Sequence, residues 1–284
     1  MQEFCLTRVA HAVPTFLMLC CLMVRAQSST AAPGATAAGL NDVLLAKATA
    51  LYDSSAKAGL RSFDCQVHPD WNRIMTSARK GAAVAPDDPK LALLNSVKIS
   101  LHAELGGGAD GSRLEWQVPE ASGKPLDQAS TAMLDQTHRG MESTLTGLLK
   151  VWAPLVNGSV AGSFGETDVS VAETAAGYTV RTKDGSLTEE FDRGLLLKHF
   201  IANEAGTTVD ILPAFEPTSE GLRLGSFVAH IHLAGAQAES GQEMRVGIEY
   251  QAVSGVQIPA AISIEMPNVV QMDFKFDGCS VNRK

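Results

Sequence analysis

The sequence predicts an α+β fold in which a large, twisted antiparallel β-sheet packs over one or two helices. Three observations support this fold. Apolar and polar residues alternate with the two-residue period of strands over most of the chain after residue 159. Two earlier segments, 40–59 and 126–153, repeat their apolar residues with helical spacing. With 45% hydrophobic and 19% charged residues, the chain can bury a sizeable core.

The first helical segment is short and amphipathic, with Leu44, Ala48 and Leu51 on one face. We expect Asn41 or Asp42 to cap its start. Gly59 is expected to end it, because glycine adopts the left-handed conformation that often terminates a helix.

A strand is predicted to follow at once, since residues 62–68 alternate and place Cys65 on the apolar side. A helical turn is then expected at Trp71–Ala78. A hairpin is expected to join the strand around Val97–Leu101 to the strand at Leu114–Val118.

The second helical segment, 126–153, is predicted to be the longest helix, with Pro125 at its start and Pro154 at its end. One stripe on its surface is apolar. This stripe consists of Met133, Met141, Leu145, Leu148 and Trp152.

Strands and turns are predicted for the rest of the chain. Asp184-Gly185 is a two-residue turn sequence between strands at 178–183 and 187–191, and further strands are expected at 195–202 and 207–215. Four one-faced strands then form an antiparallel meander with a continuous apolar face. Their apolar residues are Phe227, Ala229, Ile231 and Leu233; Met244, Val246, Ile248 and Tyr250; Ile258, Ala260, Ile262 and Ile264; and Val270, Met272, Phe274 and Phe276.

The first residues are typical of a secretory signal peptide over 1–26: Arg8 precedes the apolar run Val13–Val24, and cleavage is expected after Ala26. The run is about half of the ~20 residues that a membrane-spanning helix needs. Residues 27–38 are predicted to be a flexible linker and 39–284 a single domain. The protein is therefore expected to be periplasmic or secreted, without a transmembrane segment in the mature chain. A lipoprotein signal is a weaker alternative, because no small residue precedes Cys20 or Cys21.

The cysteines predict one disulfide. Of five cysteines, three leave with the leader, so that Cys65 and Cys279 remain. In an oxidising compartment such a pair is expected to be bonded, closing a loop of more than two hundred residues. A bulge at Gly278 would turn Cys279 to the apolar side, where Cys65 also points. Two separate thiols are the alternative.

The charge of the chain argues against nucleic acid as a partner. The formal net charge is −8, and without the leader 21 basic and 30 acidic residues leave −9. Basic residues form neither the stripe that a phosphate backbone requires nor a polybasic segment for an anionic membrane.

No sequence motif predicts a catalytic or cofactor site. Gly106–Gly111 matches a dinucleotide fingerprint in its letters, but a strand rather than a helix is predicted to follow. His230 and His232 share one face of a strand and could ligate a metal, but a third ligand is not evident; His199 and Glu249 are candidates. The carboxylates Glu189, Glu190 and Asp192 are expected in a solvated turn region. Neither a cofactor nor a bound metal is therefore predicted.

The order of these elements resembles the LolA/LolB-like lipoprotein carriers of the bacterial envelope. The resemblance rests on an amphipathic helix, the strand GLRSFDCQV directly after it, and the terminal meander EYQAVSGVQIPAAISIEMPNVVQMDFKF. It implies a curved antiparallel half-barrel around one or two helices, whose concave apolar surface accepts acyl chains. The segment 126–153 would then cover that surface, although a long middle insertion departs from the family's usual spacing.

The function we expect is non-enzymatic binding of a hydrophobic small molecule, a lipid or a lipoprotein acyl chain in the concave face. The expected lining residues are Phe227, Ile231, Met244, Ile248, Tyr250, Ile262, Met272 and Phe274. One alternative is a structural or partner-binding periplasmic module whose core is fully packed. Another is a metal-dependent hydrolase centred on His230 and His232.

Overall fold

The computed structural model describes most of the chain after residue 37. The predicted signal peptide and most of the predicted linker therefore lie outside the described residues. The described ranges are 38–55, 57–105, 111–118, 126–156, 160, 163–166, 168–204, 206–233 and 242–283.

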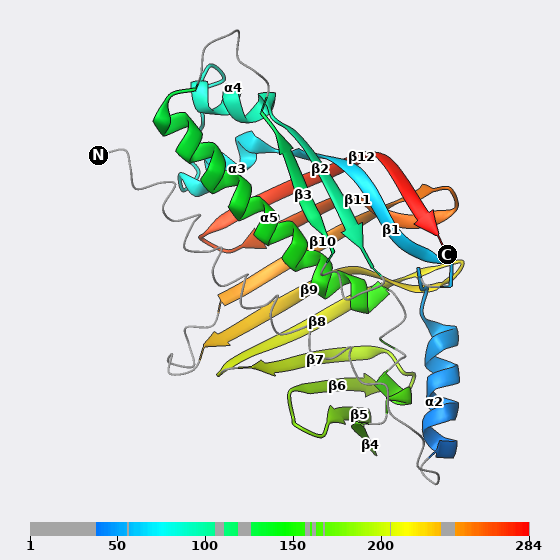
Figure 1. Ribbon diagram of the computed structural model, residues 1–284. Helices are drawn as coiled ribbons and strands as arrows, with labels where there is room; N and C mark the ends of the chain where they lie inside the picture. The colour runs from blue at the N-terminus through cyan, green and yellow to red at the C-terminus, as the bar shows by residue number, and fades with distance from the viewer. Residues whose placement is uncertain are drawn as a thin grey trace.

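Four α-helices and one short 3-10 helix lie among the described residues (Figure 1). They are α2 (Ala38–Leu51), α3 (Trp71–Ala78), α4 (Pro89–Ser96), α5 (Gln128–Val156) and η2 (Ser163–Gly165). In the described ranges, none of them combines the length and the apolar character needed to cross a membrane.

The limits of α2 differ from the prediction. The helix begins at Ala38, before the expected caps Asn41 and Asp42, and it ends at Leu51 rather than at Gly59. It ends early because the next residues join a strand: the Asp53 amide donates to the carbonyl of Leu222 at 2.8 Å. Gly59, at φ 73°, lies instead in the turn before the first strand.

The predicted helical turn at Trp71–Ala78 is confirmed as α3, whose start is capped by the Asp70 carboxylate. Helix α4 was not predicted. Asp88 caps it in the same way, and Pro89 occupies its first turn, where a missing amide hydrogen costs nothing.

Among the described residues, twelve strands form one antiparallel sheet, so the predicted combination of a large antiparallel sheet with helices is confirmed. The sheet does not close into a barrel, because β3 and β4 are its two edges. Its order is β3-β2-β1-β12-β11-β10-β9-β8-β7-β6-β5-β4. The strands are β1 (Leu60–Pro69), β2 (Lys98–Glu104), β3 (Arg113–Gln117), β4 (Val169–Glu173), β5 (Gly177–Thr182), β6 (Leu187–Asp192), β7 (Leu197–Glu204), β8 (Thr207–Thr218), β9 (Gly221–Leu233), β10 (Gln242–Val253), β11 (Val256–Met266) and β12 (Val270–Arg283).

One strand pairing determines this order. Every other pair of adjacent strands is consecutive in sequence, but β1 pairs with β12, near the other end of the chain. As a result β3 and β4 lie at opposite edges, roughly 50 Å apart at about 4.8 Å per strand spacing. Helix α5 connects them. Its 29 residues span roughly 44 Å, and it runs diagonally across one face of the sheet (Figure 1).

The face under α5 is the apolar one. Along β9, the alternating residues Phe227, Ala229 and Ile231 are at most 3% exposed, as the two-residue period predicted. The stripe of α5 packs into the same core. Its residues Met133, Met141, Leu145, Leu148 and Trp152 are all buried.

The predicted disulfide is present: the sulfur atoms of Cys65 and Cys279 are bonded across the β1–β12 pair. The predicted bulge is also present. Asp64 pairs with Ser280 and Gln66 with Asp277, so that Gly278 and Cys279 together face Cys65. Gly278 has a φ of 55°, which glycine adopts without steric cost. The bulge thereby brings Cys279 to its partner.

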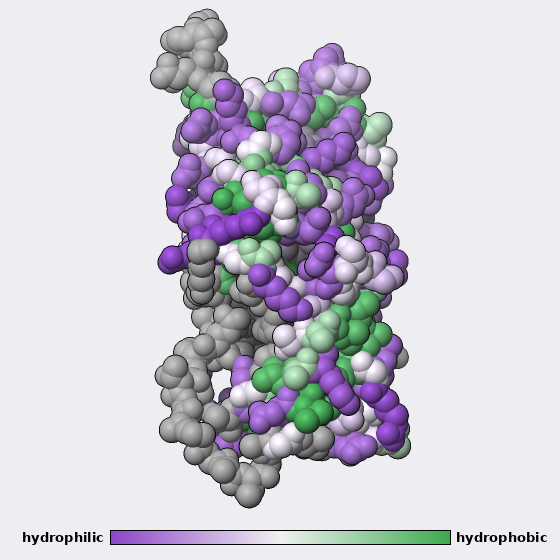
Figure 2. Space-filling view, turned by 90° about the vertical axis from the view of Figure 1, so that its right-hand side faces the viewer, coloured by the Kyte–Doolittle hydropathy of each residue, from purple (hydrophilic) through white to green (hydrophobic). Residues whose placement is uncertain are grey.

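Figure 2 shows the side of the molecule on which α2 lies, and most of this surface is hydrophilic. Apolar residues gather in its lower half, at the height of α2. Val43 on α2 is 49% exposed, while Leu44 and Ala48 on the same helix are buried. The helix therefore contributes one face to the core and leaves apolar side chains on the surface.

The bulge leads to a test of backbone strain. We expect Gly278→Ala to lower the free energy of unfolding by about 1–2 kcal/mol, because an L-residue is strained at this φ. The new Cβ would meet only Gln66 Cγ at 3.6 Å, an ordinary contact, so crowding adds little. Urea denaturation measures the difference. Gly39→Ala in α2, where nothing lies within 4 Å, is the control and should leave stability unchanged or increase it.

Candidate functional site

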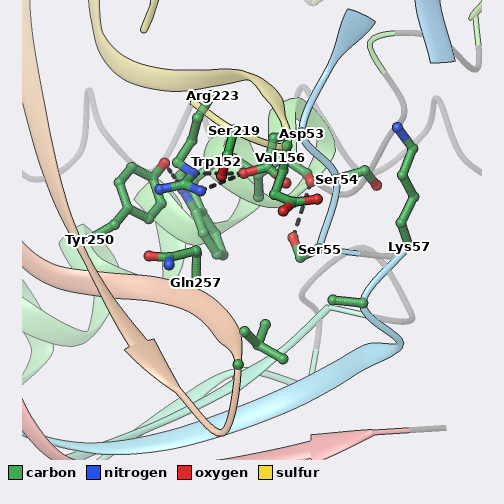
Figure 3. Close-up of a pocket in the computed structure, with 14 residues that line it drawn as sticks. Asp53, Ser54, Ser55, Lys57, Trp152, Val156, Ser219, Arg223, Tyr250 and Gln257 are labelled. Atoms are coloured by element: carbon green, nitrogen blue, oxygen red, sulfur yellow. Dashed lines mark hydrogen bonds and ion pairs between the residues drawn. The ribbon is translucent and has the colours of Figure 1, made fainter. Parts of the chain in front are cut away.

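A pocket of about 350 Å³ lies where the C-terminal turn of α5 meets the ends of several strands (Figure 3). Four parts of the chain form it: the segment between α2 and β1, the end of α5, the β8–β9 turn with the start of β9, and the β10–β11 turn with its flanking strands. Its lining residues are Asp53, Ser54, Ser55, Lys57, Ala58, Trp152, Val156, Ser219, Glu220, Arg223, Tyr250, Gly255, Val256 and Gln257.

A chain of hydrogen bonds holds the end of α5 to the sheet beside this pocket. Trp152 Nε1 donates to the Tyr250 hydroxyl at 3.0 Å, and that hydroxyl donates to the carbonyl of Leu224 at 2.7 Å. Burial raises the pKa of the Tyr250 hydroxyl well above its usual value, so it stays protonated and remains a donor. The other side of Trp152 contacts Phe63 edge-on, with ring centroids 6.1 Å apart.

An ion pair lies over the same tyrosine. The Arg223 guanidinium donates to Asp53 Oδ2 from Nε at 2.8 Å and from Nη2 at 2.6 Å. Both side chains are less than one-fifth exposed, at 17% and 18%. The guanidinium carbon is also 5.1 Å from the centre of the Tyr250 ring, within the range of a cation–π contact. This pair therefore ties the segment after α2 to β9 and β10.

Two helices end at the pocket, and their terminal carbonyls are satisfied locally. Lys57 Nζ donates to the carbonyls of Thr49 and Tyr52 at the end of α2. The carbonyl of Val156 at the end of α5 accepts from both the amide and the hydroxyl of Ser55, each at 3.0 Å. These contacts compensate for the missing hydrogen bonds of a helix C-terminus.

Two hydroxyl groups at the pocket already have partners within the protein. Both hydrogen bonds of the Tyr250 hydroxyl are used within the protein, and Ser55 donates to a backbone carbonyl rather than to a base.

The eight lining residues expected from sequence lie on the core face of β9–β12. Strand pairing sets Phe227 opposite Val246, and Ile262 opposite both Ile248 and Phe274. Six of the eight are less than 9% exposed. They are Phe227, Ile231, Met244, Ile248, Ile262 and Phe274, whereas Met272 and Tyr250 are partly buried against the same core. Tyr250 is the member of the set that lines the pocket.

Sequence reasoning did not find Arg223 or Asp53. The two are 170 residues apart, and no local pattern links them. A bulge also interrupts the alternation of β9: Phe215 pairs with Leu224 and Ala214 with Ser226, leaving Gly225 unpaired. Leu224 and Phe227 are therefore both buried although they are three residues apart.

His230 and His232 lie on β9, away from the pocket lining. Asp210 is the register partner of His230, and its Oδ1 is 3.2 Å from Nδ1 of the candidate ligand His199. Within the described ranges, no three His, Cys, Asp or Glu side chains are grouped so as to hold a metal ion.

Most of the glycine-rich segment 106–111 lies outside those ranges; the flanking strands β2 and β3 pair with each other, as the predicted hairpin requires.

Glu189 is not in a solvated turn, contrary to the prediction. It lies on β6 and is 5% exposed, because the two-residue period places it on the core face with Phe191. Phe164 of η2 packs on Phe191 with ring centroids 4.8 Å apart and covers this region. Burial, together with the nearby charge of Glu166, raises the pKa of Glu189 to about 8.

Comparison with known proteins gives no match to a protein-family model, a curated protein or a solved structure. The site is therefore interpreted from its own geometry.

The hydrogen-bond chain at Tyr250 leads to a prediction for stability. We expect Tyr250→Phe to lower the free energy of unfolding by about 1–3 kcal/mol, because Trp152 Nε1 and the Leu224 carbonyl would both lose a buried partner. Chemical denaturation followed by tryptophan fluorescence measures this loss. The control is Tyr178→Phe on β5, a half-buried tyrosine that should tolerate the change.

Glu189 leads to a prediction for pH dependence. Its ordinary pKa of 4.5 applies in the unfolded chain, so between pH 4.5 and about 8 only the folded state keeps the proton. The free energy of unfolding should then fall as pH rises through this window, by as much as about 1.4 kcal/mol per pH unit. Glu189→Gln should remove this slope and stabilise the protein most at pH 8–9. The exposed neighbour Glu190→Gln is the control, and an unchanged slope in Glu189→Gln would contradict the prediction.

Proposed function

We propose that this protein is an exported, non-enzymatic envelope protein that binds a hydrophobic ligand. The ligand would be a lipid or a lipoprotein acyl chain, held between α5 and the concave face of a β half-barrel. The proposal includes a relationship to the LolA/LolB-like carriers, which the order of α2, β1 and the terminal strands supports.

One observation carries the proposal: the apolar face of an open sheet is covered by a single long helix with a pocket at its end. In a closed barrel, neighbouring strands would hold every wall in place. Here the described sheet has two edges, β3 and β4, and α5 takes part in none of its strand pairings. Trp152, Val156 and Val256 line the pocket and also belong to the core, so the pocket borders this apolar layer.

A second function is favoured by the burial of the expected lining. Six of those eight residues are less than 9% exposed and share one core cluster with Leu145, Leu148 and Trp152 of α5. Such packing is typical of a structural or partner-binding module that needs no ligand to fill its core. The two functions differ in whether the layer under α5 can accept additional atoms.

Ala229→Leu distinguishes these two functions. Ala229 is fully buried on the core face of β9, opposite Ile211 and Met244. If the layer accepts a ligand, the added methyl groups should be tolerated, and binding of the apolar probe 1-N-phenylnaphthylamine should weaken by about tenfold. If the core is fully packed, the same change should destabilise the protein by about 1–3 kcal/mol, with no probe binding to lose.

Ala252→Leu, at an exposed position of β10, is the matched control and should change neither quantity. Native mass spectrometry of the protein purified from the envelope provides a second measurement. A co-purified lipid mass is expected, whereas a clean apo mass together with absent probe binding would contradict the carrier function.

A further inference from the structure

The pocket at the end of α5 is chemically unlike the apolar layer beside it. Charged and hydroxyl-bearing side chains form much of its lining, and Trp152, Val156 and Val256 form the side that joins the core. A ligand that occupied both regions would have a polar end and an apolar end.

We propose that this pocket binds an uncharged, hydroxyl-rich head group, such as a sugar or polyol, of an amphiphile whose apolar chain lies under α5. The inference rests on the proposed function and specifies the class of ligand.

The charges in the pocket lining balance. The lining includes two acidic residues, Asp53 and Glu220, and two basic residues, Lys57 and Arg223, so its formal charge is zero. Both cations already have partners: Arg223 is paired with Asp53, and Lys57 donates to carbonyls at the end of α2. A charged head group would meet charges of both signs in this lining, so that no net opposite charge compensates for its lost hydration, which is costly in a partly buried site.

Three polar side chains in the pocket are left for a ligand. The side chains of Ser54, Ser219 and Gln257 line the pocket, and none of them hydrogen-bonds to another residue in the part of the chain that the structure describes. Ser54 is only 7% exposed, so its hydroxyl has little access to bulk water. Serine hydroxyls and the glutamine amide both donate and accept, as do the hydroxyls of a sugar or polyol.

Aromatic residues lie beside these polar groups. Tyr250 and Trp152 form one wall of the pocket, opposite the segment with Ser54 and Ser55 (Figure 3). Aromatic rings next to polar groups suit the mixed polar and C–H surface of a sugar. A pocket of about 350 Å³ lies at the small end of the usual range for ligand sites, which fits a head group rather than a whole lipid.

The test compares three single-chain amphiphiles of similar chain length, whose head groups are an uncharged sugar, a carboxylate and a quaternary ammonium. Octyl β-glucoside, octanoate and octyltrimethylammonium would be titrated calorimetrically into the mature protein below their micelle-forming concentrations. The glucoside should bind at least about tenfold more tightly than either charged compound. Equal affinities, or a preference for a charged compound, would overturn the head-group site while leaving the carrier function intact.

Variants test the charge argument directly. Asp53→Asn gives the pocket a formal charge of +1, and the preference should shift toward octanoate by about tenfold. Glu243→Gln removes one carboxylate from another arginine pair, with Arg245, roughly 23 Å along β10 from Tyr250, and should leave the ranking unchanged. An identical ranking in the two variants would refute the assignment.

Gln257→Leu provides a variant that keeps the Arg223–Asp53 ion pair. It should weaken octyl β-glucoside binding by about fivefold and leave octanoate binding unchanged, because it removes an amide partner of the hydroxyls. Methyl β-glucoside separates this inference from the proposed function. If methyl β-glucoside binds as tightly as octyl β-glucoside, the head-group site is supported and the carrier function is contradicted. If none of the four compounds binds, both are overturned.

Discussion

The pairing of β1 with β12 is the constraint on which the rest of this structure depends. It is the one non-sequential pairing in the sheet, and the Cys65–Cys279 disulfide crosslinks it. Once these strands are neighbours, β3 and β4 must lie at opposite edges. The segment between them must then cross the whole sheet. A long helix can span that distance while its backbone hydrogen bonds are satisfied within the helix.

The crossing helix also explains where the pocket lies. Because α5 covers the apolar face obliquely, its last turn reaches the ends of β9, β10 and β11 beside the segment after α2. The chain bends there, and polar groups from four segments converge on a small volume. Trp152 belongs to both environments, since its ring is in the core and its indole nitrogen joins the hydrogen-bond chain through Tyr250.

Two buried polar sites in this protein show opposite physical solutions. At the pocket, Arg223 and Asp53 neutralise each other and contact an aromatic ring, so charge is retained with little exposure. At Glu189, a carboxyl group lies on the core face with no ion-pair partner among the described residues, and its raised pKa keeps it protonated at neutral pH. The Arg223–Asp53 pair keeps charged hydrogen-bonding groups next to the pocket, whereas the buried Glu189 carboxyl makes the free energy of unfolding depend on pH.

The sequence by itself determined the class of fold, most strand positions, the presence of the long helix, the disulfide and the bulge at Gly278. These features depend on local period, turn chemistry and residue counting, which are visible within short windows. The predicted end of the long helix was wrong, because α5 continues through Pro154 to Val156. The tertiary structure decided the early end of α2, the burial of Glu189 and the pocket. Arg223 and Asp53 are 170 residues apart. A bulge at Gly225 also breaks the alternation along β9 between Arg223 and the core residues that sequence reasoning did identify. Contacts of this kind arise from long-range strand pairing and local register shifts, for which no periodic pattern in the sequence provides a signal.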